Sequence, residues 1–472
     1  MSEKETAGQV LEGRLTRAKK KVWETLGPRE REEVFVLADR YKSFVSRAKT
    51  ERESAREIME RARGAGFVRL DELRELRPGQ RFFICSRKKI VLLGVWGENS
   101  WEEGFRLVGA HLDAPRLDVK PQPLYESDGL ALMKTHYYGG IKKYQWPALP
   151  LAIHGIVITS TGREVELVLG ENQDEPVFTV TDLLPHLARE QMEKKLVEGI
   201  RGEDLNLLVG SLPYPDEAVK EKVKLAVLDF LHRQYGLIEE DLVSAELEVV
   251  PAGTTRDVGF DRGLVGGYGQ DDRICVFTAL EAILELERPA RTALALFVDK
   301  EEIGSVGNTG ARSRFLESTL ARLHRLATGR MEDVPVWDIL NKSMALSADT
   351  MAGLDPNYPD VLDKFNAPVL GNGVVLLKYT GSGGKYDASD AHAETVAQVR
   401  RLFNEQGIIW QGGELGKVDQ GGGGTIARFL AELGLDVLDC GPALLGIHSP
   451  FEVASKGDLY MSYKAYQVFL EK

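Results

Sequence analysis

The pattern of apolar and polar positions changes along the chain, and the first part predicts helices followed by a sheet. Residues 30–48 and 51–65 are charged and amphipathic, with apolar positions at helical spacing. Short apolar runs that are typical of β-strands follow at residues 81–85, 90–95 and 105–110. The last of these runs leads directly into His111-Leu-Asp113.

The middle section has a different pattern. Residues 136–146 are rich in Tyr and Gly, and they are too apolar for an ordinary solvated loop. We therefore predict that residues 121–255 form a smaller, β-rich domain that is inserted into the rest of the chain and mediates oligomerisation. Within it we predict a β-hairpin at residues 155–159 and 164–169, helices at 181–196 and 215–235, and a strand at 246–250.

After residue 256 the chain alternates between strand and helix. Residues 292–298 are continuously apolar, which is expected of a strand buried on both faces. The other predicted elements are helices at 274–286 and 392–406 and strands at 343–347, 374–379 and 435–439. This alternation predicts an α/β domain with helices on both faces of a mostly parallel sheet, built from residues 1–120 and 256–472.

Composition narrows the possible partners and the compartment. The 472 residues include 60 Lys+Arg and 72 Asp+Glu, a net charge of −12, which argues against nucleic acid or an anionic membrane as the main partner. Cys85, Cys275 and Cys440 show no CxxC spacing, so neither a disulfide framework nor a thiolate zinc site is predicted. The N-terminus is polar, and no run approaches 18 apolar residues. We expect a cytoplasmic protein.

His111 is a candidate functional histidine because of its position. It lies in VGAHLDAP, at the carboxyl end of a predicted buried strand, the edge of an α/β sheet where ligands bind. Asp113 is placed to orient the imidazole, as carboxylates near metal-bound histidines usually do. The HxD spacing alone is common.

Glu301 and Glu302 form a stronger candidate. In FVDKEEIGSVG the apolar strand runs directly into these adjacent glutamates. Their like charges would repel each other unless a cation lies nearby, and a metal site would resolve this conflict. One glutamate could then bind the metal while the other transfers protons. The alternative is a pair of solvated loop glutamates.

Three further residues complete a candidate ligand set, although each is weak evidence alone. Asp271 lies in GQDDR at a helix start, where it could also serve as a cap. Asp349 follows a strand in SAD, and His448 lies in GIHS near the C-terminus. Oxygen and nitrogen ligands without sulfur suit zinc, manganese or cobalt. Two such ions, about 3.5 Å apart and bridged by a carboxylate, would polarise a carbonyl and activate water.

Taken together, the motifs are specific. Over about residues 40–465 the chain resembles the aspartyl aminopeptidase/aminopeptidase I family of co-catalytic two-metal peptidases. The motifs occur in the family's order: GAHLDAPRLDVK, GQDDR, DKEEIGSVGNTGA, SADTMAGLDPNY and GGGGTIARFLAELGLDVLDCGPALLGIHS. The resemblance implies a metalloaminopeptidase that acts on peptides with a free N-terminus. It also implies an α/β sandwich catalytic domain in three layers, an inserted β-rich domain and a homododecamer.

The resemblance also implies roles for individual residues. The implied terminal metal ligands are His111, Asp349, Glu302 and His448, and Asp271 is the bridging carboxylate. Asp113 would support His111, and Glu301 would be the general base. In related enzymes the bridging aspartate precedes a cis peptide bond, here Asp271–Asp272. The metals would be two divalent ions, most commonly zinc, with manganese or cobalt as alternatives.

The substrate pocket departs from the family pattern. Family members carry a second histidine in a PHLAxH segment that reaches a neighbouring subunit, whereas here His186 is followed by Arg189 and Glu190. Histidines that often follow the SAD aspartate are replaced by Ala352 and Asp355. These changes concern the pocket and leave the metal ligands intact.

Three positions are predicted to contact the substrate, namely His186, Lys378 and Gly423. Lys378 matches a lysine that family members associate with an acidic substrate side chain, although an ordinary strand-end lysine is an equal alternative. Gly423 lies in a glycine run, residues 421–424, that lacks the phosphate-loop pattern GxxxxGK[ST]. This run is better suited to a close approach between backbone and peptide.

Two other functions are compatible with parts of this pattern. One is a different two-metal hydrolase on the same scaffold, such as an acylase or a carboxypeptidase. The other is a non-catalytic scaffold protein, which would have no need for Glu301.

Overall fold

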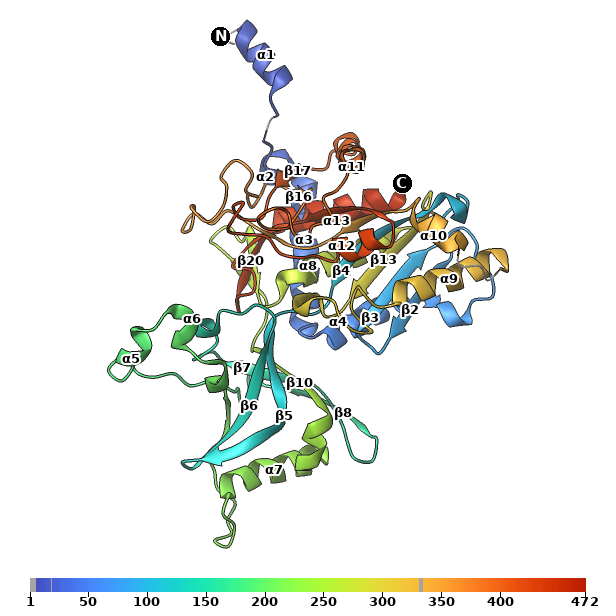
Figure 1. Cartoon of the computed structure of the whole chain (residues 1–472). Helices are drawn as coiled ribbons and strands as arrows, with labels where there is room; N and C mark the ends of the chain where they lie inside the picture. The colour runs from blue at the N-terminus through green and yellow to red at the C-terminus, as the bar shows by residue number, and fades with distance from the viewer. Residues whose placement is uncertain (1–5, 18, 331–333) are drawn as a thin grey trace.

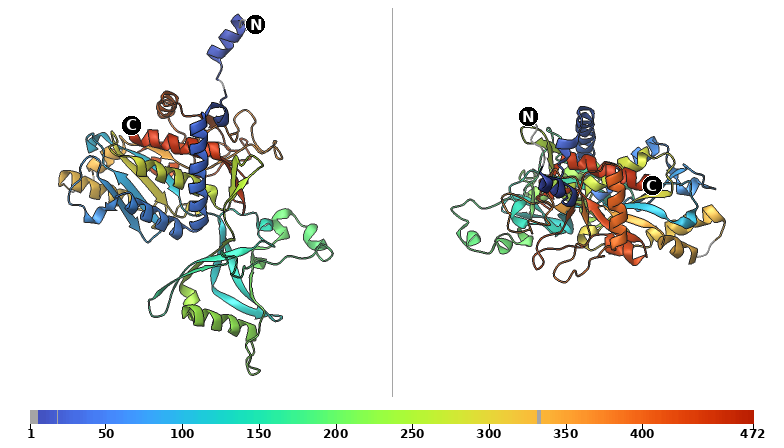
Figure 2. Two further views of the ribbon diagram at one scale, coloured as in Figure 1. Left: turned by 180° about the vertical axis from the view of Figure 1, so that it is seen from behind. Right: turned by 90° about the horizontal axis from the view of Figure 1, so that it is seen from above.

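The structure is a computed structural model that describes residues 6–17, 19–330 and 334–472. Two lobes are visible, a larger one in which helices cover a sheet and a smaller one built mainly of strands (Figure 1). The same two lobes are seen from behind in the left view of Figure 2, whereas they overlap in the view from above. The chain is therefore of the mixed α/β class, as predicted from its alternating pattern.

The larger lobe is built on a sheet whose middle strands are parallel. In spatial order its strands are β1 (Val68–Arg69), β2 (Arg81–Ser86), β3 (Ile90–Val95), β13 (Thr292–Val298), β4 (Phe105–His111), β14 (Met344–Ser347), β18 (Asp436–Gly441), β16 (Val374–Leu377) and β17 (Trp410–Gly413). Strands β13, β4, β14 and β18 run parallel to one another, while β2, β3 and β16 add antiparallel pairings.

Helices cover both faces of this sheet. Successive residues of β13 point into two different apolar cores, Ala293 and Phe297 into one and Leu294 into the other, because side chains alternate along a strand. The first core is closed by α2 (Val22–Thr25), α3 (Pro28–Arg47), α4 (Glu51–Gly64), α8 (Gln270–Glu285), α11 (Ala393–Glu405) and α13 (Lys456–Glu471). The second is closed by η1 (Leu70–Glu72), η2 (Trp101–Glu103), α9 (Phe315–Thr328), α10 (Val334–Leu340) and α12 (Ala427–Glu432).

The smaller lobe contains an antiparallel sheet. Its strands, in spatial order, are β8 (Glu164–Leu169), β7 (Leu151–Ile158), β10 (Ala245–Pro251), β5 (Arg116–Ser127), β6 (Leu130–Tyr138) and β9 (Leu207–Gly210). It also contains α5 (Arg189–Met192), α6 (Leu196–Gly199), α7 (Lys222–Tyr235), η3 (Lys143–Gln145), η4 (Gly202–Asp204) and η5 (Glu239–Ser244). Strands β7 and β8 form the predicted hairpin.

A third, short sheet lies beside the larger one. It consists of β11 (Arg256–Val258), β12 (Leu264–Gly267), β20 (Glu452–Ser455), β19 (Ala443–Leu445) and β15 (Met351–Ala352). The helix α1 (Ala7–Leu15) buries none of its residues and projects from the larger lobe (Figure 1). Within the part of the chain that the structure describes, no helix has the length and apolarity needed to cross a membrane.

Two predicted helices of the smaller lobe are wrong in extent. Instead of one helix at 181–196, the segment forms only the single turn α5, and α6 begins at its last residue. Its apolar residues Leu183, Leu184 and Leu187 are exposed and do not pack an apolar face that would stabilise a longer helix. The helix predicted at 215–235 begins at Lys222. Its first N–H groups donate to the carboxylate of Glu126 on β5, a cap that local sequence cannot reveal.

The Tyr- and Gly-rich segment 136–146 packs partly inside its own chain. Trp146 is completely buried in the core of the smaller lobe. Tyr137 and Tyr144 remain 43% exposed. Some apolar residues of this segment therefore pack in the core of the smaller lobe, while others lie on its surface.

Candidate metal centre

Three adjacent parallel strands bring their carboxyl ends to one edge of the larger sheet. His111 ends β4, Glu301 and Glu302 follow β13 in the short helix η6 (Glu301–Ile303), and Asp349 follows β14. Val298 of β13 pairs in register with His111, so these polar residues meet directly beyond the last buried residues. Such an edge is where open α/β sheets bind ligands.

Two further residues reach this edge from the third sheet. Asp271 follows β12, where α8 begins, and the regular helical conformation starts only after Asp272. The peptide bond between Asp271 and Asp272 is cis, as the resemblance implies. His448 lies in the connection between β19 and β20, with a positive φ of 65°. The five predicted ligands thus come from two sheets.

Asp271 lies between the two imidazole rings. Its Oδ1 is 3.5 Å from Nε2 of His111, and its Oδ2 is 3.2 Å from Nε2 of His448. Nε2 of His111 is also 3.8 Å from Oδ1 of Asp349, and Nε2 of His448 is 3.2 Å from Oε1 of Glu302. Each histidine is therefore paired with its own carboxylate, and Asp271 is shared.

The tautomer of each histidine follows from the hydrogen-bond partner of its Nδ1 atom. Nδ1 of His111 lies 3.0 Å from the backbone oxygen of Asp113, and Nδ1 of His448 lies 3.1 Å from that of Gly140. A carbonyl oxygen can only accept, so each Nδ1 carries the hydrogen. In a neutral ring Nε2 is then left with its lone pair directed towards the carboxylates, as a metal ligand requires.

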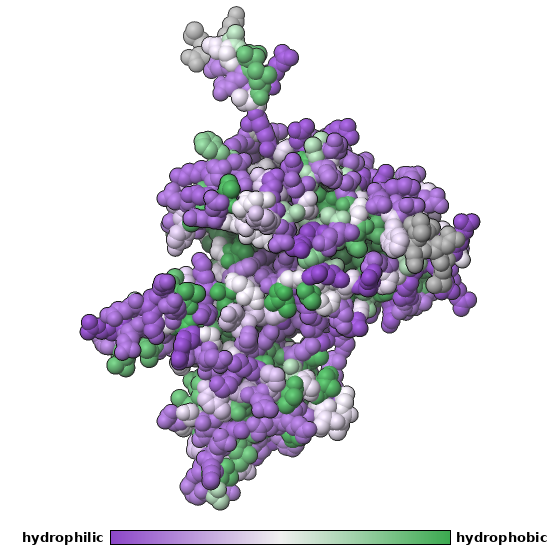
Figure 3. Space-filling view, in the orientation of Figure 1, coloured by the Kyte–Doolittle hydropathy of each residue, from purple (hydrophilic) through white to green (hydrophobic). Residues whose placement is uncertain are grey.

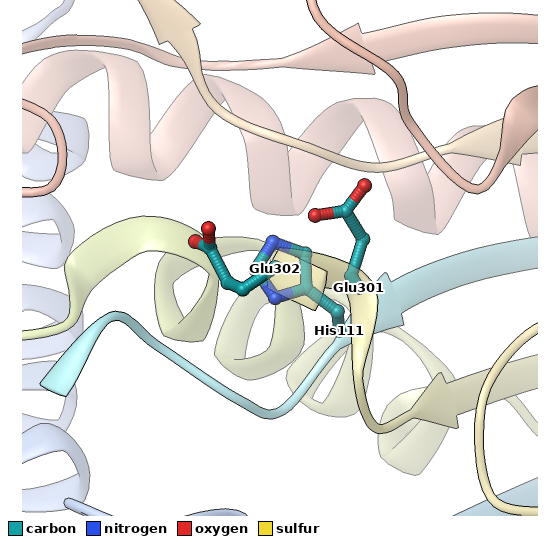
Figure 4. A group of neighbouring side chains, drawn as sticks. All are labelled: His111, Glu301 and Glu302. Atoms are coloured by element: carbon teal, nitrogen blue, oxygen red, sulfur yellow. The ribbon is translucent and has the colours of Figure 1, made fainter. Parts of the chain in front are cut away.

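The side chains of His111, Glu301 and Glu302 are drawn in Figure 4. The two glutamates occupy adjacent positions but diverge, with the imidazole ring between them in this view. The ligand atoms of these three residues lie within 4.8 Å of one another, and so do those of Asp271, Glu302 and His448. A third such group consists of His111, Asp272 and Asp349.

These residues fit a bound cation. Among the described residues no hydrogen-bond donor satisfies the buried atoms Oδ1 of Asp271 and Oε1 of Glu302. An unpaired buried carboxylate oxygen is costly, and coordination to a metal removes the cost. The donors are nitrogen and carboxylate oxygen, which zinc accepts.

Electrostatics point the same way. Burial, together with the charge of neighbouring carboxylates, raises the pKa of Glu301, Glu302 and Asp349 above the usual range. Burial would lower the pKa of His448, but the carboxylates of Asp271 and Glu302 raise it to about 12. The cluster thus carries an excess of negative charge that a cation would neutralise.

Comparison with known proteins identifies the family. Residues 44–470 match the family described as "Aminopeptidase I zinc metalloprotease (M18)". The chain is 47% identical over 460 residues to the "Probable M18 family aminopeptidase 1" of Clostridium acetobutylicum, with 97% of this chain and 99% of the relative covered. The chain belongs to the M18 aminopeptidases.

Solved structures agree with this assignment. The crystal structure of an M18 aminopeptidase from Thermotoga maritima superimposes on this chain with a TM-score of 0.93 at 47% identity. The match covers 97% of this chain and 100% of the Thermotoga chain. The structure of the mApe1 dodecamer from S. cerevisiae matches at a TM-score of 0.74 and 21% identity, covering 93% of this chain and 97% of its own. The M18 chain is a zinc metalloprotease of the aminopeptidase type, an enzyme that hydrolyses peptide bonds.

Three buried acids of the M18 chain accept backbone N–H groups of the predicted ligands and of Glu301. Asp113 accepts the backbone N–H groups of Glu301 and Glu302, each at 3.1 Å. Asp272 accepts the N–H of His111 at 3.3 Å. Glu452, which the sequence analysis did not identify, accepts the N–H of Asp271 at 3.0 Å and that of His448 at 2.8 Å. The single carboxylate of Glu452 thus joins two predicted ligands that lie far apart in the sequence.

The three predicted substrate-binding residues lie in different places. Gly423 lines a cavity of about 600 Å³ together with all five predicted ligands and Glu301. Lys378 is exposed and lines a separate cavity with Arg17 and Trp410. His186 is exposed in the turn before α5. Of the three, only Gly423 is therefore brought to the metal centre within one chain.

The glycine run beside the cavity is needed for close packing. Gly422 has a φ of 92°, and a Cβ atom there would lie 2.4 Å from the backbone nitrogen of Ser382. The N–H of Gly423 donates to the carbonyl of Thr380 at 3.1 Å. The run thus forms one wall of the cavity through its backbone.

Arginines missed by the sequence analysis also line the cavity. Arg428 is paired with Asp387 at 2.6 Å. Arg312 also lines the cavity with an exposed side chain, whose guanidinium carbon lies 5.5 Å from the ring centroid of Phe429, and it forms no ion pair among the described residues. Arg312 directly follows the motif DKEEIGSVGNTGA, but it lies outside that motif and was not assigned a role from the sequence.

Proposed function

We propose that this M18 chain hydrolyses the N-terminal bond of peptides with a free N-terminus by means of two metal ions bridged by Asp271. The observation that carries this proposal is the position of the Asp271 carboxylate, with one oxygen near the imidazole of His111 and the other near that of His448. A carboxylate shared in this way is the arrangement expected of a two-metal site.

The other ligands separate into two groups. Asp349 lies on the side of His111, and Glu302 on the side of His448. We assign His111 and Asp349 to one ion and Glu302 and His448 to the other, with Asp271 shared between them. Two zinc ions suit this set, and manganese or cobalt would also be accepted by its nitrogen and oxygen donors.

Glu301 is the residue left to transfer protons. It lines the cavity beside His111 but lies outside the cluster formed by Asp271, Glu302 and His448. When bound, the metals would polarise the scissile carbonyl and lower the pKa of a water molecule. Glu301 would accept the proton of this water and pass it to the leaving amine. Asp113 holds the backbone of Glu301 in place through its N–H group.

One of the two cavity arginines, Arg312, suggests a preference for acidic N-terminal residues. A substrate side chain bearing a carboxylate could pair with Arg312, whereas Arg428 already pairs with Asp387. Lys378 remains the residue that the resemblance predicts for this contact. We propose that Asp and Glu are favoured over neutral residues at the substrate's N-terminus.

A metal-reconstitution assay on a substrate panel tests both parts of this proposal. Zinc is added stepwise to apo-enzyme, and kcat/KM is measured for Asp-, Glu-, Leu- and Lys-anilides. We expect activity to require a second equivalent of zinc and to be highest for Asp and Glu. Arg312→Met should lower kcat/KM for the acidic substrates about tenfold, since a charged hydrogen bond contributes about 1.5–3 kcal/mol, and leave Leu-anilide unchanged.

Controls distinguish the alternatives. Lys378→Met is the matched variant, and it will show the larger effect if Lys378 rather than Arg312 binds the acidic side chain. An N-acetylated Asp-anilide should not be cleaved at either amide bond, and release of acetate from it would indicate an acylase. Full activity with one equivalent of zinc would contradict the two-metal proposal. Preference for Leu-anilide, unchanged in both variants, would contradict the acidic preference.

We also propose that the chain folds as a three-layer sandwich domain, residues 1–120 and 256–472, interrupted by an inserted assembly domain, residues 121–255. The arm around α5 and α6 carries exposed apolar side chains, and apolar patches are visible on it in Figure 3. These residues are Leu183, Leu184, Leu187, Met192, Leu196 and Val197, all more than half exposed. Such a surface is typical of an interface, and the mApe1 relative is a dodecamer. A homododecamer is the proposed assembly.

Light scattering of the full-length chain measures this assembly. We expect a mass of about twelve chains, and Leu187→Glu should give smaller species because it introduces a charge where an apolar side chain, 70% exposed in one chain, would be buried. Val361→Glu, at an exposed apolar position of the larger lobe, is the control. A wild-type protein that is monomeric at micromolar concentration would contradict the proposal.

The cytoplasm remains the proposed compartment. Cys85, Cys275 and Cys440 are all free thiols, which suits a reducing environment.

A further inference from the structure

The end of strand β6, in the smaller lobe, reaches into the metal centre. Tyr138 is the last residue of this strand and is half-buried, and Gly139 and Gly140 follow it. A Cβ atom on Gly139 would lie 3.3 Å from Cβ of Glu302, and one on Gly140 would lie 3.2 Å from Nδ1 of His448. This segment therefore packs directly against two of the predicted ligands.

Tyr138 contacts the centre through Asp113. Its hydroxyl donates to Oδ2 of Asp113 at 2.9 Å, and the same oxygen accepts the N–H of Glu302. The other oxygen, Oδ1, accepts the N–H of Glu301. Asp113 is completely buried, so these donors set the orientation of its carboxylate. One of them comes from the smaller lobe.

Arg116 holds the ring of Tyr138. The two residues face each other across strands β5 and β6, and the guanidinium carbon lies 3.9 Å from the ring centroid. Arg116 is buried and paired with Asp118 at 2.8 Å and with Glu248 at 3.1 Å. A cation stacked on an aromatic ring and anchored by carboxylates restricts the ring, and so fixes the direction of the phenol.

A second contact from the same segment supports the other side of the centre. The Gly140 carbonyl accepts Nδ1–H of His448 and thereby directs Nε2 towards Asp271 and Glu302. Outer partners of this kind orient metal-bound histidines. The Tyr138–Gly140 segment thus contacts Asp113 on one side and His448 on the other.

We infer that Tyr138 is a positioning residue of the metal centre, which acts through Asp113 on the proposed base Glu301 and the proposed ligand Glu302. This inference rests on the proposed two-metal function. It also gives the smaller lobe a second role, because the lobe completes the metal centre of its own chain in addition to mediating assembly. Removal of the whole lobe would therefore disturb catalysis and assembly together. A variant that lacks a single atom tests the contact to the metal centre alone.

The variant Tyr138→Phe removes only the hydroxyl. We expect kcat to fall about tenfold with KM little changed, and zinc to bind about tenfold more weakly, since losing an outer-shell partner costs about 10–100-fold in metal affinity or activity. Zinc affinity is measured by competition with a chromogenic chelator, independently of turnover. Tyr137→Phe is the matched control, because this neighbouring hydroxyl lies on a 43% exposed side chain. Its kcat and zinc affinity should equal those of the wild type.

A double-mutant cycle shows whether Tyr138 acts through Asp113. In an Asp113→Asn background, Tyr138→Phe should have no further effect on zinc affinity, whereas independent residues would give additive losses. Additive losses would overturn this inference alone. The same conclusion would follow if Asp113→Asn were impaired while Tyr138→Phe kept wild-type kcat and zinc affinity. An Asp113→Asn enzyme with unchanged zinc affinity and kcat would contradict both this inference and the proposed two-metal function.

Discussion

Replacing Glu301 with glutamine is expected to lower kcat by about 10²–10⁴-fold while the bound metal is retained. Glutamine has nearly the same shape but cannot accept a proton from water. The backbone N–H of Glu301 would still donate to Asp113, so the turn after β13 should be preserved. Metal content measured by mass spectrometry beside steady-state kinetics tests this expectation.

Glu302→Gln provides a matched contrast at the adjacent position. Oε1 of Glu302 lies 3.2 Å from Nε2 of His448, and we assign it to a metal ion. Loss of its charge should lower metal content as well as kcat, whereas Glu301→Gln should affect turnover alone. If the Glu301→Gln variant keeps near-wild-type kcat, Glu301 is not the base. If the variant loses metal, Glu301 is a metal ligand.

Asp271→Asn is expected to weaken binding of both metal ions and to lower activity by more than 100-fold. The carboxylate of Asp271 is shared by the two proposed ions, so losing its charge affects both. Outer-shell changes already cost about 10–100-fold, and a bridging ligand should cost more. Its backbone N–H would still donate to Glu452. The measurement is zinc per chain after dialysis, compared with kcat.

Asp458→Asn is the control for loss of a buried carboxylate. Asp458 is completely buried and accepts the N–H groups of Gly371 and Gly373 at 2.6 and 2.7 Å, outside the cavity of the metal centre. We expect a lower Tm with full metal content. Retention of both zinc ions by Asp271→Asn would remove Asp271 from the bridging position.

Local pattern was sufficient for the buried strands. Strands β3 and β13 have the bounds that the continuous apolar runs predict, and β4 was predicted one residue short of its end at His111. These strands are buried on both faces, so the whole run must be apolar and its polar flanks mark its ends. Polar residues at the ends of such runs led to His111, Glu301 and Glu302, which the structure places at the ends of β4 and β13.

Helix extent in the smaller lobe could not be predicted in this way. Residues 181–196 have helical periodicity, but a helix of this length depends on packing an apolar face, and in one chain these residues find none. Helix α7 starts where Glu126, nearly 100 residues earlier, accepts its first N–H groups. Both outcomes depend on contacts between distant segments.

Two of the supporting residues of the centre were also invisible in the sequence. Glu452 joins the backbones of Asp271 and His448, and Tyr138 reaches Asp113 from another lobe. Neither residue belongs to a recognisable spacing. Lys378 matched the family pattern, yet the cavity that contains the predicted ligands is lined by Arg312 instead.

The sequence by itself determined which residues could bind metal, because strand ends, adjacent acids and ligand chemistry are properties of short segments. Only the tertiary structure decided how these residues meet. The carboxylate of Asp271 lies between His111 and His448 because two different sheets bring their ends together. Likewise, Tyr138 supports Asp113 only because the smaller lobe folds against the larger one. Contacts over such sequence separations depend on the packing of whole elements, which local pattern does not encode.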